Sequence, residues 1–368
     1  MITKIYKRVL LILFTLHFSL LTSQAQTVSS FYQPGITAEG AVYFLPKTAV
    51  NITIQVEKTT YTPGDFCLYA ERFLRIKDVS PTPDVSYHIT AIRQEAIAVA
   101  DTAKRYAVKF DPKTSAANVR LSDNGILLGI NTNDEVKDYT LLQNNAHTSH
   151  LSTPVALPNP RQYMNEETLT AGSTAKMAEL TAQDIYEIRE SRSLLVRGQA
   201  DNMPKDGEQL RLMLNQLDVQ DRALTSLFTG TVIKDTVEQV FTIVPENNIN
   251  HEILFRFSKK LGLVDKDDLS GVPYYINIEN LRTVPLPESV DPKKKLKPVY
   301  GIFVNVPGRL RSSVSDSQAV LISNDFPAGQ FGNVELLSGA LFNKHYTTHL
   351  WLNPISGAIE RLDAEQPK

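Results

Sequence analysis

The chain has 368 residues, of which 42% are hydrophobic, 21% charged and 8% aromatic. These proportions are typical of a folded globular protein and exclude a disordered, fibrous or collagen-like chain. A formal net charge of -2, from 38 Lys and Arg against 40 Asp and Glu, leaves no bulk positive field to attract nucleic acid, so we expect no nucleic-acid partner.

Residues 1–25 have the three parts of a secretory signal peptide. An apolar run from Val9 to Leu21 is followed by the small-residue site Ser23-Gln24-Ala25, and the basic residues before the run are Lys4, Lys7 and Arg8. The run is shorter than the ~20 residues of a membrane span, and no later segment is long and apolar enough to cross a bilayer. We therefore expect cleavage after Ala25, a periplasmic or secreted protein, and no membrane span in the mature chain.

Cys67 is the only cysteine, so the chain cannot form an internal disulfide. No histidine lies near it in the sequence to activate a thiolate, and a small buried apolar role is the favoured interpretation. The length of the chain indicates two domains.

Residues 26–150 are expected to form an N-terminal β-rich domain. Strands are predicted over Ala41 to Phe44 and Thr48 to Lys58, separated by a turn at Pro46-Lys47, because apolar and polar residues alternate strictly along the second strand. A short helix is predicted from Phe66 to Arg75. The strands expected to follow are Val85 to Ile92, Tyr106 to Phe110, and a hairpin of Val119 to Leu121 with Ile126 to Ile130 over Asp123-Asn124-Gly125.

Residues 151–172 form a proline-rich connection, and residues 173–230 are predicted to be a pair of antiparallel helices. Gly198 and Gly230 end the two helices. Their apolar stripes are expected to face a sheet, which makes Leu214 and Leu217 core residues. The stripes are Met177, Leu180, Ile185, Ile188, Arg192 and Leu195 in the first helix, and Leu210, Met213, Leu214, Leu217, Leu224 and Phe228 in the second.

Residues 231–368 are expected to form a C-terminal β-rich domain. Its last hairpin, Tyr346 to Leu352 with Ala358 to Leu362, closes over a loop in which Gly357 takes a positive φ. The earlier strands are predicted over Thr236 to Val244, Ile253 to Phe257, Tyr274 to Ile278, Val299 to Val306, Ala319 to Ser323 and Val334 to Leu337. The predicted fold class is therefore α+β: two antiparallel β-rich domains, a central antiparallel helix pair, and a short helix inserted in the N-terminal domain.

Four segments together resemble a known family: Tyr61-Thr62-Pro63-Gly64, Tyr69 to Leu74, the hairpin from Leu121 to Gly129, and Leu227-Phe228-Thr229-Gly230. The chain is similar over nearly its whole mature length to exported Bacteroidetes proteins that contain the domain of unknown function four-eight-three-one. The resemblance implies a Gram-negative envelope protein and implies no activity, cofactor or catalytic residue. In such bacteria Asp-Thr followed by a small apolar residue can carry O-linked glycan, and Asp101-Thr102-Ala103 and Asp235-Thr236-Val237 fit that pattern.

The sequence identifies no catalytic residue and predicts no cofactor. It contains neither the Gly-x-Ser-x-Gly of a nucleophile elbow nor a glycine-rich phosphate loop. We also predict no metal site: His251-Glu252 lacks the second histidine of a zinc helix because position 255 is Phe255, and His345 and His349 are ~13 Å apart if they lie on one strand. The acidic group Asp265, Asp267 and Asp268 is interpreted as a solvated turn.

Two further groups have ordinary structural interpretations. Exposed aromatic residues could stack on sugars, but Trp351, Tyr274, Tyr275 and Tyr346 lie on predicted strands, where core or cross-strand packing is commoner. The run Lys293, Lys294, Lys295 and Lys297 lies between prolines and is interpreted as a solvated loop.

The favoured hypothesis is an exported, non-enzymatic binding or assembly protein of the cell envelope, whose partner is an envelope component or a glycan. The alternative is a hydrolase of glycans or peptides whose carboxylates converge only in three dimensions. A pocket with two carboxylates ~5–9 Å apart and a perturbed pKa would favour the hydrolase. An exposed apolar patch or an unpaired strand edge would favour binding.

Overall fold

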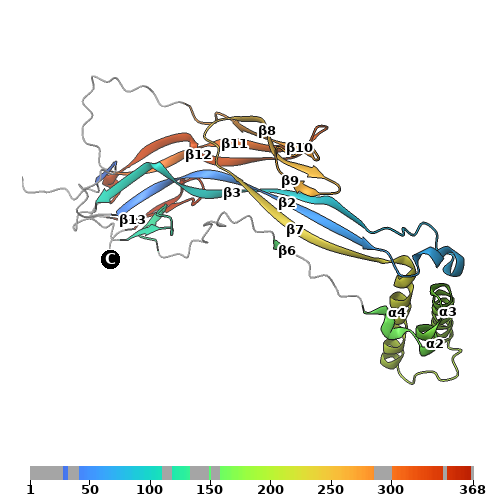
Figure 1. The fold of residues 1–368 in the computed structure, drawn as a ribbon. Coiled ribbons are helices and arrows are strands. Elements are labelled where there is room, and N and C mark those ends of the chain that lie inside the picture. Colours follow the sequence, from blue (N-terminus) through green and yellow to red (C-terminus); the bar gives the residue numbers. More distant parts are fainter. Residues whose placement is uncertain are drawn as a thin grey trace, which may run out of the picture.

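The computed structural model describes residues 28–31, 41–109, 118–132, 149–150, 158–285, 301–342 and 346–365. Three antiparallel sheets form an elongated body, and a group of helices lies at one end of it (Figure 1). The predicted α+β class is confirmed.

The first sheet has the strand order β1-β3-β2-β7-β6 and runs the length of the molecule. Its strands are β1 (Val28–Phe31), β2 (Ala41–Thr62), β3 (Asp84–Lys109), β6 (Ser149–His150) and β7 (Thr231–Ile243).

Strand β2 is continuous where the sequence suggested two strands and a turn. Pro46 stays within the strand, opposite Ala100, with a register shift between Phe44 and Pro46. A bulge tolerates a residue that has no N–H to donate, so the proline bends the strand instead of ending it.

Strand β3 likewise unites the two predicted strands Val85 to Ile92 and Tyr106 to Phe110. The stretch between them pairs with β2 as far as Ala100, opposite Pro46, and pairing resumes at Arg105. This stretch is rich in alanine and shows no clear alternation of apolar and polar residues, so the sequence did not indicate a strand there. Backbone pairing with β2 nevertheless keeps it in the strand.

The second sheet has the order β12-β11-β10-β8-β9 and covers one face of the first sheet. Strand β12 joins the two segments that were predicted separately, Ala319 to Ser323 and Val334 to Leu337. The strands are β8 (Ile249–Ser258), β9 (Gly262–Val264), β10 (Val272–Asn280), β11 (Gly301–Ser315) and β12 (Val320–Ser338).

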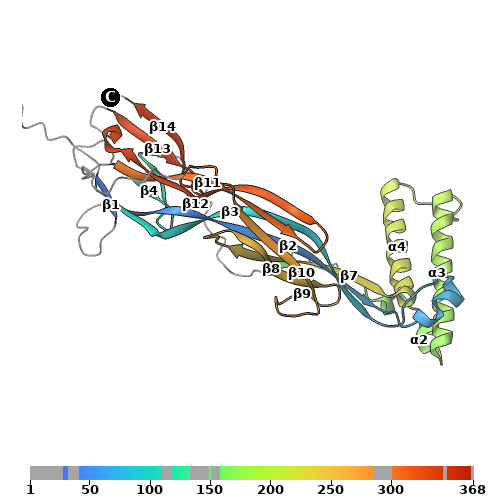
Figure 2. The same cartoon turned by 90° about the horizontal axis from the view of Figure 1, so that it is seen from above.

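The third sheet has the order β14-β13-β5-β4 and lies at the end of the body away from the helices (Figure 2). Both of its predicted hairpins are confirmed, with Gly125 at φ 74° and Gly357 at φ 71°. The strands are β4 (Val119–Leu121), β5 (Leu127–Ile130), β13 (Thr347–Leu352) and β14 (Ile359–Glu365), and a 3₁₀ turn, η4 (Gly339–Phe342), precedes β13.

The predicted N-terminal and C-terminal halves share sheets and cores. Strand β7 pairs with β2, and β13 pairs with β5. One core cluster joins Tyr43 and Leu127 to Val304 and Leu350, and a second joins the alternating face of β2 to the strands of the second sheet. The expected boundary at residues 151–172 therefore does not divide the hydrophobic core, because strands from both sides of it pair with one another.

Beyond the second sheet, β2, β3 and β7 continue as a three-stranded arm that carries the helical head (Figures 1 and 2). The head contains the predicted antiparallel pair, α3 (Thr174–Arg197) and α4 (Gly207–Thr229). Smaller elements complete it: a 3₁₀ turn η1 (Cys67–Tyr69), a π turn η2 (Ala70–Leu74), a 3₁₀ turn η3 (Pro160–Tyr163) and a short helix α2 (Glu166–Thr170). The short helix expected from Phe66 to Arg75 is thus present as η1 and η2.

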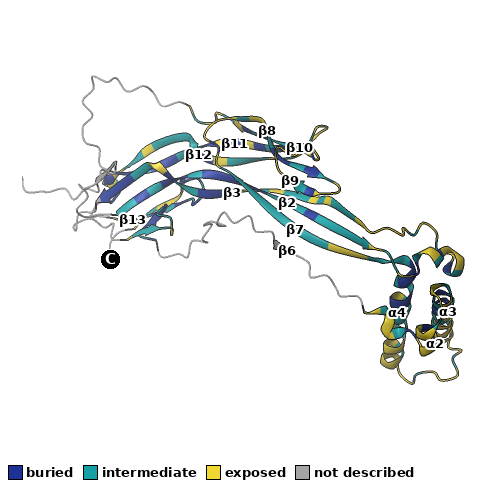
Figure 3. Cartoon of the chain, in the orientation of Figure 1, coloured by how far each residue is buried: buried dark blue, intermediate teal, exposed yellow. Residues whose placement is uncertain are grey.

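The apolar stripes of the helix pair do not face a sheet, which corrects that expectation. Near the arm they pack on each other and on η1 and η2, where Ile185, Leu224 and Phe228 are buried. Farther along the pair only two helices remain, and much of their surface is exposed (Figure 3). Leu214 and Leu217 are half-buried there. An amphipathic stripe predicts that a face is covered, but it does not specify what covers it.

Candidate functional site

The head is joined to the arm at a neck formed by Tyr61, Gly64, Phe66, Leu227 and Gly230. Apart from Phe66, these residues belong to two of the segments that resemble the family, and those segments lie about 160 positions apart in the sequence. The Tyr61 hydroxyl lies 2.8 Å from the carbonyl oxygen of Ser80 and 3.2 Å from that of Thr229. The neck thus ties β2 both to the loop before β3 and to the end of α4.

Close backbone packing at the neck requires glycine. The amide of Phe66 donates to the carbonyl of Leu227 over 2.7 Å, and a Cβ on Gly64 would collide with that same peptide group. Gly230 has φ 77°, and a Cβ there would collide with the carbonyl of Thr62. The chain passes through the neck with no space for side chains at these positions, so the neck fixes the orientation of the head on the arm.

The far end of the helix pair carries exposed apolar side chains. We define the hairpin tip as Leu194, Val196, Met203, Leu212 and Met213, of which Val196 is 67% and Leu212 59% exposed. No other described element lies beside the hairpin tip in either view of the fold (Figures 1 and 2). These exposed apolar residues make the outer end of the helix pair a candidate protein-binding surface.

Ion pairs between the helices support the pair midway along its length. The Arg189 guanidinium lies 3.0 Å from the Asp221 carboxylate, and that of Arg192 lies 3.1 Å from Asp218. Arg189 also donates to the Thr225 hydroxyl over 3.2 Å. These polar contacts link the two helices in the region where the apolar core of the head thins out.

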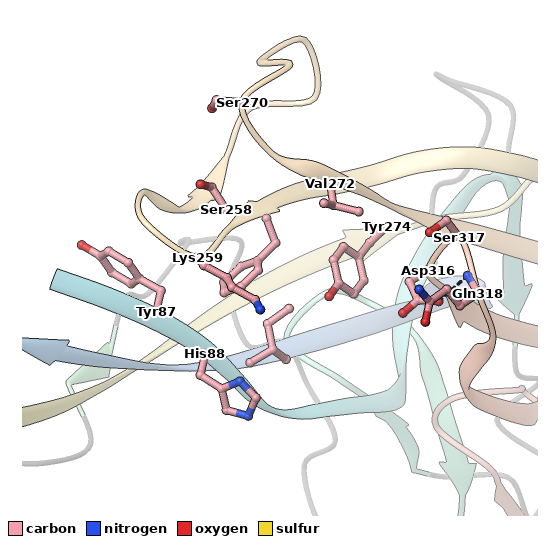
Figure 4. A pocket seen from close by; sticks show the side chains of 12 residues that line it. Tyr87, His88, Ser258, Lys259, Ser270, Val272, Tyr274, Asp316, Ser317 and Gln318 are labelled. Carbon is pink, nitrogen blue, oxygen red and sulfur yellow. Dashed lines mark hydrogen bonds between the residues drawn. The ribbon is translucent and has the colours of Figure 1, made fainter.

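A second candidate lies where the arm leaves the sandwich. Here β3 and the second sheet enclose a pocket of about 520 Å³, which we call the sandwich mouth (Figure 4). Tyr87 and Ile89 of β3 form one wall, and Phe257, Val272 and Tyr274 of the second sheet form the other. Polar residues border it: Ser258, Lys259, Ser270, Asp316, Ser317 and Gln318. His88 also lines the pocket, and its ring lies on the other side of the β3 ribbon from the ring of Tyr87 (Figure 4).

The polar groups at the sandwich mouth differ in their hydrogen bonds and ion pairs. The Asp316 carboxylate accepts the amides of Gln318 over 2.7 Å and Ala319 over 2.8 Å, and these hydrogen bonds lower its pKa. Burial, and to a lesser degree Asp316, raises the pKa of the Tyr274 hydroxyl, which therefore stays neutral at pH 7. Among the described residues, the Lys259 ammonium has no carboxylate within ion-pair distance.

A second hollow, of about 380 Å³, lies beside β7, β8 and β9 and includes Asp265 and Asp268. Hydrogen bonds from Ser270 lower the pKa of Asp268, so this carboxyl is not a general acid at neutral pH. Neither hollow brings together two carboxylates of which one has a raised pKa. These two hollows therefore do not support the hydrolase hypothesis.

Among the described residues, the candidate metal ligands do not come together. No group of three or more His, Cys, Asp or Glu in the described ranges could hold an ion. The ring of His251 stacks on Tyr275 with 3.8 Å between centroids, and His349 Nδ1 contacts the carbonyl of Asn131. His345, and the side chain of His150, lie outside what the structure describes.

Of the other sequence candidates, Cys67 is half-buried at the start of η1. It belongs neither to the hairpin tip nor to the lining of the sandwich mouth. The guanidinium of Arg361 lies over the ring of Trp351, 4.8 Å from its centroid, so that face is already occupied. In the glycosylation-like segments, Thr102 is exposed beside a buried Asp101, whereas Thr236 is half-buried in β7. The lysine run at 293–297 lies outside the described residues.

Sequence reasoning passed over Lys259 and the hairpin tip. Lys259 lies in the turn after β8, and a lysine in a turn carries no sequence signal that it lines a pocket. Leu212 lies outside the helical stripe, and an isolated apolar residue of that kind gave no distinctive pattern.

Within the described residues, no helix has both the length and the apolar composition needed to cross a membrane. No curated protein and no solved structure matches the chain significantly. The family model described as "Domain of unknown function (DUF4831)" matches residues 39–360, which include the neck, the head and the sandwich mouth. Because that match spans most of the chain, the protein belongs to the DUF4831 family.

Proposed function

We propose that the protein is exported to the cell envelope and acts there as a non-enzymatic binding or assembly protein, holding a protein partner with its hairpin tip. The observation that carries the proposal is the exposure of apolar side chains at the end of a head that a rigid neck holds away from the body. Leu194, Met203 and Met213 are 36%, 40% and 38% exposed, and Val196 and Leu212 are more exposed still.

Exposed apolar side chains favour binding because their contact with water is unfavourable. Burying apolar surface contributes ~25 cal/mol per Å², so side chains such as Val196 and Leu212 would be stabilised by a partner that covers them. Two methionines at the hairpin tip add side chains that adapt to different partner shapes. Export is supported by the signal-peptide pattern of residues 1–25 and by the envelope location that the family resemblance implies.

Site-specific photocrosslinking in the source cells tests the proposal. A photoreactive phenylalanine analogue at Val196 or Leu212 should crosslink to a discrete envelope protein. Matched controls are Leu269 and Val320, which are 82% and 63% exposed on the body. Crosslinks from the controls to the same protein, or no crosslink from the hairpin tip, would contradict the proposal.

A further inference from the structure

We propose that the sandwich mouth binds a small amphiphilic carboxylate, a ligand with an apolar body and one anionic group, with Lys259 as its counter-ion. This inference does not depend on the proposed role of the hairpin tip, which lies at the other end of the arm.

The apolar part of the site is an extension of the core. Phe257 pairs with Val272 across β8 and β10, and Phe255 pairs with Tyr274, so all four side chains share the inward face. Phe255 and Tyr274 stack with 4.7 Å between ring centroids, while Val272 at the end of the row is 55% exposed. The exposure of Val272 leaves this part of the apolar wall open to solvent.

Lys259 lies in the turn that follows β8 and contributes a positive charge to the lining of the pocket. Figure 4 shows its side chain directed between the rings of Tyr87 and Tyr274. With no carboxylate of the described residues within ion-pair distance, its ammonium is available to an anion. Ligand pockets typically combine apolar walls with a few polar groups of this kind.

Backbone contacts hold the wall and the lysine in place. The Tyr87 amide donates to the Lys259 carbonyl over 2.9 Å, and Lys260 forms an ion pair with Asp84. The Tyr87 ring packs on Gly262, where a Cβ would lie 3.0 Å from the ring. The site is therefore formed before a ligand arrives, which lowers the entropic cost of binding.

Asp316 sets the polarity of the opposite border. Its carboxylate is held by two amides of its own turn and lies on the far side of Tyr274 from Lys259 in Figure 4. An anionic group is therefore directed to the Lys259 side of the pocket, and the apolar body lies against Val272 and Phe257. A pocket of about 520 Å³ accommodates a ligand of modest size.

Calorimetric titration of the full-length mature protein tests the site with octanoate, octyltrimethylammonium and N-acetylglucosamine. Octanoate should bind and the cationic amphiphile should not. Lys259→Met should weaken octanoate binding about tenfold or more, and Lys259→Arg should retain it, because a charge-assisted contact is lost only in the first. Val272→Glu, which places a negative charge in the wall, should also abolish binding. Lys205→Met, at an exposed position of the head, is the matched control and should bind as the wild type does.

Unchanged octanoate binding by Lys259→Met, or equal binding of the two amphiphiles, would overturn the proposal. So would binding of N-acetylglucosamine alone, because that would identify a neutral sugar site. Equal melting temperatures of all variants would show that any loss is local. Crosslinking at the hairpin tip is not expected to change in Lys259→Met, so failure here is distinguishable from failure of the proposed function.

Discussion

At the scale of single residues, Gly64 shows why the neck holds the head firmly. Its Cα lies against the backbone of Leu227, so any side chain must displace α4. We predict that Gly64→Ala destabilises the protein by about 1–3 kcal/mol, the usual cost of overpacking a close contact. Gly172→Ala is the control, because nothing lies within 4 Å of a Cβ there, and it should change stability by less than about 0.5 kcal/mol. Chemical denaturation measures both, and equal stability of the two variants would contradict a tightly packed neck.

Asp84 provides a test of pH dependence at the sandwich mouth. Its hydrogen bond with Lys260 lowers its pKa below the ordinary value of 3.8. A carboxyl with a lowered folded pKa contributes stability above its unfolded pKa, and this contribution is lost as the pH falls through the folded value. The Asp84→Asn variant should therefore melt slightly below the wild type at neutral pH, and the difference should vanish in acid.

Melting curves from neutral pH to about pH 2 measure this difference. Because the pair is exposed, the effect should be small and should shrink with added salt. Asp201→Asn, in the exposed loop of the head, serves as the control. A difference that grows as the pH falls would contradict the assigned ion pair.

At the scale of elements, local signals were predictable and the associations between elements were not. Gly125, Gly198 and Gly357 mark turns and a helix end because a positive φ is a property of a few neighbouring residues. The bulge at Pro46 was not predictable in this way, since backbone pairing with β3 keeps the strand continuous. The exposure of the hairpin tip was not predictable either, because an apolar stripe predicts that a helix face is buried but does not identify the element that packs against it.

Substitutions of apolar residues should therefore destabilise the protein strongly at the base of the head and weakly toward its tip. Leu224 is 1% exposed and packs with Phe228, whereas Leu214 is half-buried. Leu224→Asp should destabilise by roughly 3–5 kcal/mol because it buries an unpaired charge. Leu214→Asp should cost about 1 kcal/mol, because its carboxylate can reach water. Thermal denaturation of the two variants checks the contrast, and equal losses would mean that the core of the head extends to its tip.

At the scale of the whole molecule, the long strands bind the two halves of the chain together. Strand β7 follows the helix pair and returns to pair with β2 along its outer stretch, and β13 pairs with β5 at the other end. The helical head is thus an insertion between paired strands, and the body is one connected structure. Composition and length had suggested two separately cored halves, but they contain no information about which strands pair.

Limited proteolysis tests this connectivity. Cleavage near Arg161, which is exposed, should leave a nicked protein that remains a single particle on size-exclusion chromatography. The fragments should separate only in denaturant, and neither should refold alone, because each would leave apolar strand faces uncovered. Two fragments that part under native conditions and unfold cooperatively would restore the two-domain interpretation.

Binding of the partner by the hairpin tip can be measured as the affinity of the protein for the crosslinked envelope protein. The double variant Val196→Ser with Leu212→Ser should bind about tenfold or more weakly than the wild type, because a few buried apolar residues dominate an interface. Val320→Ser with Leu321→Ser, at exposed positions of β12, should bind normally. Full affinity of the tip variant, or an equal loss in the β12 variant, would contradict the account.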